Sequence, residues 1–190
     1  MTPKDGSGPS DKELVDSFQR DRNAESLDVL VERYVERTRN LIYGMVLSDS
    51  DADDLTQETF LNVMRGLAGF DGRSKFSTWL YQIALNATRR FFRTRRTPDG
   101  IGQKEIANKT APMNEEPQRK ALGSELQDRI TGSLGALPPP LRAAVVLMVI
   151  EGLPAKEVAD IEGCSPETVR WRVHEARKLL KQHLAEYLQP

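Results

Sequence analysis

The last third of the chain carries the feature that most constrains its fold, a pair of short helical segments at 153–159 and 165–172 joined by a turn that contains Gly163. Ser165 is placed to cap the second segment, and Pro166 occupies its first helical position, where the fixed φ of proline suits a helix. Two helices joined in this way form a helix-turn-helix. Because the second helix of that motif enters the DNA major groove, the pattern predicts a DNA-binding domain.

The composition favours small domains and gives no general sign of a nucleic-acid partner. Of the 190 residues, 38% are hydrophobic and 6% aromatic, and the net charge is -1. The two signs of charge are segregated, with acidic residues at 49–58 and arginines at 89–96. The single cysteine, Cys164, excludes an internal disulfide, and we interpret it as a small packed residue rather than a redox sensor. Because no leader and no long apolar run is recognisable, we expect a cytoplasmic protein.

Apolar residues recur at helical spacing on both sides of a polar, proline- and glycine-containing stretch at 97–123, which indicates an extended linker. Nothing alternates with a period of two, so we expect an all-α protein of two small helical domains, the second containing the helix-turn-helix. A capping box of Ser10 and Glu13 opens the first predicted helix, and the apolar stripe from Leu27 to Met45 indicates the second. A second capping arrangement at 50–53 opens the third. Further helices are predicted from Phe76 to Arg96 and, beyond the linker, from Leu141 to Ile150.

The predicted helix at 76–96 carries a polar face opposite its apolar side. Arginine holds phosphates, asparagine and glutamine pair with base edges, and an aromatic ring stacks on an unpaired base, so this face suits nucleic acid. The alternative is an ordinary solvated surface with Trp79 at its border. The residues that share the face are Trp79, Gln82, Asn86, Arg89, Arg90 and Arg93.

A second polar strip lies on the predicted third helix, on the side opposite its core. Asp54, Gln57, Glu58 and Leu61 follow one another at steps that align on one helix face. DNA phosphates would repel this acidic strip, which therefore suits a protein partner. An ordinary surface, with carboxylates favoured near a helix N-terminus, explains the residues equally well.

Several segments closely resemble the bacterial extracytoplasmic-function (ECF) sigma factors of the sigma-70 family. The resemblance covers about 11–96 and 125–186, in the family's order, and it rests on two independent motifs in register. DADDLTQETF (51–60), FDGRS (70–74) and FSTWLYQIALN (76–86) resemble region 2, while LPP (137–139) and GCSPETVR (163–170), with His174 and Arg177, resemble region 4.

This resemblance implies that the chain is divided into four parts. They are a disordered tail at 1–10, region 2 at 11–96, a linker at 97–124 and region 4 at 125–186. An extended linker spans up to ~80 Å, whereas two turns of B-DNA measure roughly 70 Å. One molecule can therefore reach two separate promoter elements.

The resemblance also implies a role for each polar surface. The strip of Asp54, Gln57, Glu58 and Leu61 docks the clamp helices of the largest polymerase subunit. The minus-10 element is opened, and a flipped base captured, by Arg73, Ser74, Lys75, Trp79, Gln82, Asn86, Arg89, Arg90 and Arg93. The minus-35 element is read by Ser165, Glu167, Thr168, Arg170, Trp171, His174, Arg177 and Lys178, while Val169, Val173, Ala176 and Leu180 face inward.

Two positions depart from the family's pattern. Pro154-Ala155-Lys156 stands where the family carries a small polar residue and an aromatic, and Trp171 replaces a small residue on the recognition helix. Neither change disturbs the expected fold, because proline is tolerated in a first turn and Trp171 points outward. Trp171 could contact a thymine methyl group, the sugar backbone or a protein partner.

The expected function is that of an RNA polymerase sigma factor, which binds core polymerase, recognises the two promoter elements and promotes melting. The implied partners are the clamp helices and the flap of the second large subunit, promoter DNA, and an anti-sigma factor that could hold the protein at the membrane. We expect no cofactor, metal, small-molecule substrate or catalytic site, because no phosphate loop or catalytic set can be assembled. The residues leave open a dimeric factor that binds duplex DNA, and less readily an enzyme that modifies nucleic acid.

Overall fold

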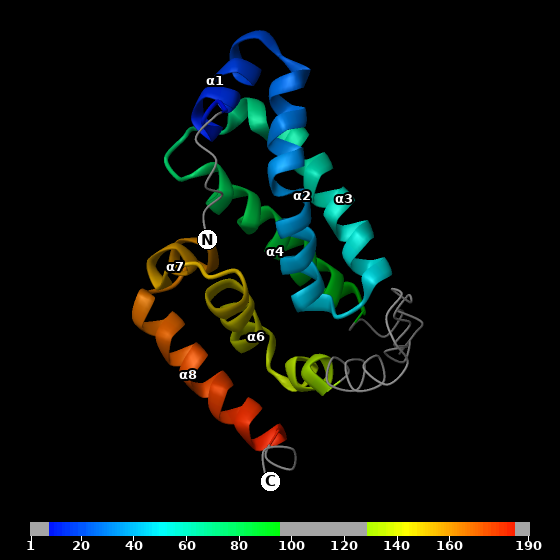
Figure 1. Ribbon diagram of the computed structural model, residues 1–190, viewed down its shortest axis with the longest axis vertical. Coiled ribbons are helices and arrows are strands. Elements are labelled where there is room, and N and C mark those ends of the chain that lie inside the picture. The colour runs from blue at the N-terminus through cyan, green and yellow to red at the C-terminus, as the bar shows by residue number, and fades with distance from the viewer. Residues whose placement is uncertain (1–7, 96–128, 185–190) are drawn as a thin grey trace.

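The computed structural model describes residues 8–95 and 129–184, and every regular element in those ranges is a helix (Figure 1). The predicted all-α fold with a helix-turn-helix in its second part is confirmed. The helices form two bodies, one before and one after residues 96–128. The predicted linker at 97–124 and most of the predicted tail lie outside the described residues.

The first body consists of α1 (Asp11–Asp21), α2 (Ala24–Val46), α3 (Asp49–Gly66) and α4 (Phe76–Arg95), with a short 3₁₀ turn at Leu67–Gly69. The capping box that opens α1 is confirmed, since the Ser10 N–H donates to the Glu13 carboxylate at 2.7 Å. The predicted cap of α3 at 50–53 is wrong. Ser48 is the N-cap, because its extended backbone turns the hydroxyl toward the Asp51 N–H at 3.4 Å.

The core of the first body is built from the apolar faces that the spacing predicted. Leu30, Leu41 and Ile42 of α2 and Leu80 of α4 are fully buried. Val35 is an exception, because it lies exposed on the outer side of α2. Burying these aliphatic side chains contributes about 2 kcal/mol each relative to leaving them in water.

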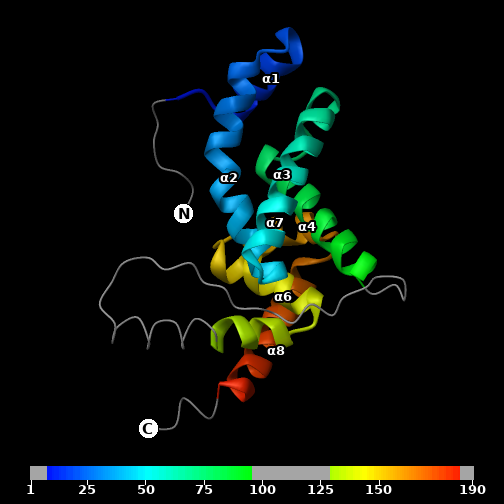
Figure 2. The ribbon, with the colours of Figure 1, turned by 90° about the vertical axis from the view of Figure 1, so that its right-hand side faces the viewer.

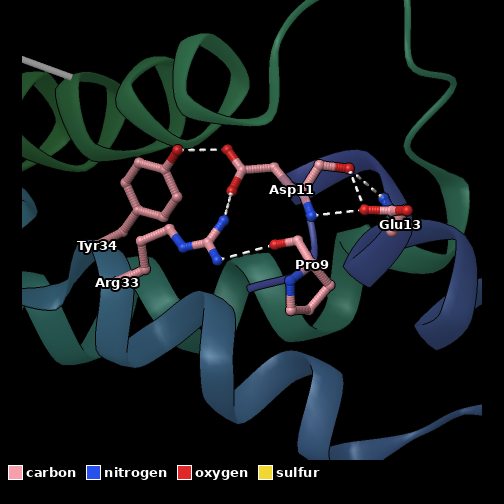
Figure 3. A network of polar contacts seen from close by, with 6 residues as sticks. Pro9, Asp11, Glu13, Arg33 and Tyr34 are labelled. Atoms are coloured by element: carbon pink, nitrogen blue, oxygen red, sulfur yellow. Dashed lines mark hydrogen bonds and ion pairs between the residues drawn. The ribbon is translucent and has the colours of Figure 1, made fainter. Parts of the chain in front are cut away.

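A polar network fastens α1 to α2 (Figure 3). The Asp11 carboxylate accepts hydrogen bonds from the Arg33 guanidinium and the Tyr34 hydroxyl, and the Pro9 carbonyl accepts from Arg33 at 3.0 Å. Burial and the hydrogen bond to Asp11 raise the pKa of Tyr34, so the phenol remains a hydrogen-bond donor even at a pH above its ordinary pKa. The network therefore holds the start of α1 against the long helix α2.

The second body begins with a helical stretch at 129–136 and contains the predicted helix-turn-helix. The apolar helix predicted at 141–150 begins earlier, because Pro139 fits the first turn, and its end widens into a π-turn in which the Glu151 N–H donates to the Val146 carbonyl at 2.9 Å. The remaining elements are α6 (Pro139–Val145), η2 (Val146–Ile150), α7 (Ala155–Glu162) and α8 (Pro166–His183).

The turn between α7 and α8 has the geometry that its sequence predicts. Gly163 ends α7 with a φ of 67°, a left-handed conformation that glycine adopts without strain. The Ser165 hydroxyl then accepts from the Thr168 N–H at 3.2 Å and opens α8. Val169, Val173 and Ala176 of α8 are buried, as predicted.

The two bodies pack together at the C-terminal end of α2 (Figure 2). A Cβ atom on Gly44 would lie 2.9 Å from a methyl carbon of Val146, so glycine permits the close approach of α2 to the second body. Leu47, just past the end of α2, is buried in an apolar cluster with Leu137 and Leu141. We call this contact of Gly44 and Leu47 with the second body the apolar seam.

A buried arginine completes the seam. Arg142 of α6 is only 8% exposed, and its guanidinium donates to the Met45 carbonyl at 2.7 Å, to the Leu137 carbonyl at 3.3 Å and to the Gly135 carbonyl. Burial lowers the pKa of this guanidinium from its usual value. The carbonyls offset part of the cost of burying this cation, while its Nε has no hydrogen-bond partner in the part of the chain that the structure describes.

We expect Arg142→Ala to lower the free energy of unfolding by about 3 kcal/mol, because carbonyls from both bodies lose their donor and a cavity is left. Urea denaturation followed by circular dichroism measures the loss. Arg177→Ala, which removes an exposed arginine of α8, is the matched control and should change the stability by less than about 0.5 kcal/mol. Equal effects of the two substitutions would contradict the structural role of Arg142.

Candidate nucleic-acid and partner surfaces

The acidic strip of α3 lies on the outside of the first body. Asp54 and Gln57 are exposed, and Leu61 is 44% exposed beside them. The strip continues one turn further to Met64, which is 48% exposed and was not among the residues predicted from the sequence. Its spacing of three residues from Leu61 was the available signal. Two exposed apolar side chains bordered by acidic and amide groups suit a protein partner.

Glu58 differs from the rest of this strip. It is half-buried and its carboxylate pairs with the Arg90 guanidinium of α4. The expectation that Glu58 is exposed is therefore wrong, because α4 crosses α3 closely enough for the two side chains to meet. The pair ties the polar face of α4 to the edge of the α3 strip.

Trp79 lies at the border between the polar face of α4 and the core. Its ring centroid is 4.9 Å from that of Phe70 and 6.0 Å from that of Phe76, and its edge packs against Gly66 of α3. Aromatic pairs at these separations stabilise a fold beyond the area they bury. Trp79 therefore braces the turn before α4. The alternative interpretation placed this residue at the border of the polar face, and its partly buried position agrees with that.

The turn that precedes α4 is open to solvent. Arg73, Ser74 and Lys75 are all exposed. The Asp71 carboxylate accepts from the Arg73 backbone N–H at 3.1 Å and pairs with its guanidinium at 2.8 Å, which shapes the turn locally. Three exposed polar side chains therefore lie in the segment that joins Phe70 to the start of α4.

The polar residues of α4 have different surroundings, because some face solvent and others contact α7. Asn86 and Arg93 are exposed, and the Asn86 amide oxygen accepts from Arg89 at 3.2 Å. Gln82 and Arg89 instead reach α7, since the Gln82 amide donates to the Asp160 carbonyl at 2.9 Å. The structure thus brings the predicted face together as one surface but covers one side of it with the second body. Helical periodicity alone does not indicate which element packs on this side.

The recognition helix α8 presents its predicted surface to solvent. Ser165 and Thr168 are occupied in the helix cap, and their hydroxyl oxygens lie 3.1 Å apart. Hydrogen bonds with its own backbone and with Ser165 lower the pKa of Glu167, which stays ionised. The exposed side chains of this surface are Glu167, Arg170, Trp171, His174, Arg177 and Lys178, with Trp171 at 59%.

Arg172 marks the limit of that surface. Its guanidinium turns back and pairs with Glu162 at 3.0 Å, so it belongs to the packing of α8 on α7. The neighbouring Arg170 is exposed and pairs with Glu167 at 3.3 Å, one turn away on the same helix. A surface pair of this kind is weak enough to exchange for a phosphate or a base edge.

Three further observations bear on the range of functions. In residues 8–95 and 129–184 no three His, Cys, Asp or Glu side chains are grouped to hold a metal ion. Among the helices described, none is both long and apolar enough to cross a membrane. Cys164 is a free, half-buried thiol that packs against the core, in keeping with a small packed residue.

Comparison with known proteins gives the relationship directly. The chain matches the family model for sigma-70 region 2 over residues 30–97 and the model for sigma-70 region 4 over residues 127–180. The RNA polymerase sigma-H factor of Pseudomonas aeruginosa is 34% identical over 186 residues, covering 94% of this chain and 95% of that protein. The ECF RNA polymerase sigma-E factor of Escherichia coli is 32% identical over 186 residues, covering 90% and 92%.

Two solved structures share the fold. CnrH, in complex with the cytosolic domain of CnrY, has a TM-score of 0.71 at 27% identity, covering 93% of this chain and 97% of that one. The sigma factor RpoE of Bartonella quintana, in complex with the anti-sigma factor NepR, has a TM-score of 0.68 at 23% identity, covering 86% and 98%.

Two helical bodies, the second with an exposed recognition helix, define a DNA-binding transcription protein. The chain belongs to the sigma-70 family and is an ECF RNA polymerase sigma factor that carries regions 2 and 4. It is thus a non-catalytic subunit of RNA polymerase, as the sequence predicted, and not a dimeric factor of another class.

We expect Trp79→Ala to lower the free energy of unfolding by about 2–3 kcal/mol, because the ring packs on Phe70, Phe76 and Gly66. Trp79→Phe keeps an aromatic ring and should cost about 1 kcal/mol. Urea denaturation measures the free energy of unfolding of both variants. Asn86→Ala, which changes an exposed residue of the same helix, is the control. If Trp79→Ala proves as harmless as Asn86→Ala, the ring does not brace the turn.

Proposed function

We propose that this sigma factor docks on core RNA polymerase through α3, opens and reads the minus-10 element through the 70–75 turn and α4, and reads the minus-35 element through α8. The division of the exposed polar surface supports this proposal. The acidic strip with Leu61 and Met64 lies on the first body, and the basic side of α8 lies on the second. DNA phosphates are repelled by the former and attracted by the latter.

Run-off transcription with core polymerase on a library of randomised promoters tests the whole proposal in one experiment. The expected result is initiation at promoters that share two sequence elements about two helical turns apart. No initiation with core polymerase, or initiation without a shared sequence, would overturn the proposal.

For the minus-10 element, we propose that the Arg73–Lys75 turn and the Phe70 and Trp79 rings hold an extruded base. Unstacking a base costs a few kcal/mol, and stacking on aromatic side chains returns about 1–3 kcal/mol per base. The arginines at positions 89, 90 and 93 would hold the phosphates on either side. In this role Trp79 both braces the turn and lines its inner wall.

We further propose that an anti-sigma factor controls this chain and that it works in the cytoplasm, with the flap of the second large polymerase subunit as an additional contact of region 4. The support for the anti-sigma factor is the likeness over nearly the full length to CnrH, whose structure holds the cytosolic domain of CnrY. The exposed α3 strip and the exposed α8 surface are both available for such a protein to bind.

We expect Asp54→Lys to weaken binding to core polymerase at least tenfold, because it reverses a charge on the docking strip. Asp54 is exposed, so the circular dichroism spectrum should be unchanged. Fluorescence anisotropy of the labelled sigma factor titrated with core polymerase measures the affinity. Asp28→Lys, an equal reversal on the exposed side of α2, is the control, and equal losses in the two variants would remove α3 from its assigned role.

We expect Arg170→Ala to weaken minus-35-dependent promoter binding by about 1–3 kcal/mol while core affinity stays the same. Binding of the reconstituted holoenzyme to promoters with and without the minus-35 element measures the contribution of that element, and a separate titration with core polymerase measures core affinity. Full retention of minus-35 dependence would show that Arg170 makes no base contact.

A further inference from the structure

Trp171 lies on the side of α8 that is opposite to the core of the second body. Val169 and Val173, two residues before and two residues after it, are both buried. Because successive residues of an α-helix are turned by about 100°, a residue two positions from each of two buried ones faces almost directly away from them. We call this side the crest of α8, a helix that lies along one side of the second body (Figure 1).

The indole of Trp171 offers a large apolar surface to whatever binds the crest. At 59%, it is the most exposed of the large hydrophobic side chains in residues 8–95 and 129–184. An aromatic ring that moves from water into a contact contributes strongly to binding. Trp171 is also the sixth residue of α8, and the N-terminal part of a recognition helix is the part that contacts base edges.

The side chains around the indole are polar. Glu167 lies one turn before Trp171, and His174 and Glu175 lie one turn after it on the same side of the helix. A protein interface usually buries several apolar side chains together, as the exposed strip of α3 is able to do. A single apolar group among polar neighbours matches the C5 methyl group of thymine, which lies among the hydrogen-bonding edges of the bases in the major groove.

The two glutamates also limit which part of the DNA the indole can approach. Glu167 and Glu175 place carboxylates four residues before and four residues after Trp171. Phosphates repel carboxylates, so this stretch of the crest is unsuited to the walls of the groove, where the two backbones run. Bases on the floor of the groove instead offer amino groups to a carboxylate. The charges beside the indole therefore favour a base edge over the sugar-phosphate backbone.

We propose that Trp171 recognises one thymine of the minus-35 element by packing its indole against the C5 methyl group of that base. This inference rests on the proposed binding of α8 in the major groove of the minus-35 element. The contact selects thymine over cytosine, which lacks the methyl group and carries an amino group where thymine carries an oxygen. Trp171 thus determines a base preference at one position of the promoter.

Deoxyuridine tests this contact, because it lacks the C5 methyl group of thymidine and keeps the same hydrogen-bonding groups. The holoenzyme is reconstituted from core polymerase and the full chain, and the promoter is one selected from the randomised library by run-off transcription. Each thymine of its minus-35 element, on either strand, is replaced in turn by deoxyuridine. Competition binding followed by fluorescence anisotropy gives the ratio of the affinities for the thymine and deoxyuridine promoters at each position.

The unmodified chain should bind about fourfold more weakly when the methyl group is removed at one thymine position, since one buried methyl group contributes about that factor. Trp171→Ala should bind the thymine promoter more weakly and should no longer distinguish it from the deoxyuridine promoter. Trp171→Phe keeps an aromatic ring but loses the indole N–H, and it should retain most of the dependence on the methyl group. Because Trp171 is exposed, the circular dichroism spectrum of both variants should be unchanged.

Arg177→Ala is the matched control. Arg177 is exposed on the same helix, but it directly follows the buried Ala176 and so lies on the flank of α8 and not on its crest. Loss of this cation should weaken the binding of the thymine and deoxyuridine promoters by the same factor. The fourfold ratio should therefore persist in Arg177→Ala, which shows that weaker binding alone does not remove it.

Four results would overturn the inference. Two concern the unmodified chain: a selected minus-35 element that contains no thymine, or equal affinity for thymine and deoxyuridine at every position. The third is an undiminished dependence in Trp171→Ala, which would assign the effect of the methyl group to another residue or to DNA shape. The fourth is a loss of core affinity in Trp171→Ala with unchanged promoter preference, which would make the indole a contact for protein.

Run-off transcription separates this inference from the proposed function. A holoenzyme that initiates at promoters with two shared elements, but gives any of these four results, keeps the proposed function and loses only the role of Trp171. A chain that fails to direct initiation with core polymerase would lose both.

Discussion

The buried guanidinium of Arg142 joins the two helical bodies beside the apolar seam. It reaches the Met45 carbonyl at the end of α2 and, within its own body, the carbonyls of Gly135 and Leu137. The last carbonyls of a helix lack partners inside that helix, so the arginine supplies donors where the chain leaves acceptors open. The position of the helix-turn-helix beside the first body therefore depends on where α2 stops.

The rest of the polar surface is organised by where the two bodies meet. On α4, Arg90 pairs with Glu58 of α3 and Arg89 pairs with Glu162 of α7. Arg93, one turn further along the helix, is exposed. Arginines that are close in sequence thus have different surroundings. A net charge near zero conceals this, because what matters for binding DNA is which cations are already engaged.

Local signals in the sequence predicted the helices, the capping box at Ser10 and the turn before α8, because each depends on residues within one or two turns. The cap of α3 was misplaced because 48–53 offers several polar residues, and only the extended backbone at Ser48 decides among them. The Arg142–Met45 and Arg89–Glu162 contacts join residues 97 and 73 positions apart. Helical periodicity identifies a polar face but not its neighbour, so these contacts could not be predicted.

The double pairing of Glu162 makes one of its two contacts dispensable. Its carboxylate oxygens are divided between Arg89 of α4 and Arg172 of α8, so the carboxylate would keep a cationic partner from α8 if the contact with Arg89 were lost. A substitution of Arg89 would therefore leave no unpaired charge in the interior, and the ion pair that joins α7 to α8 would remain.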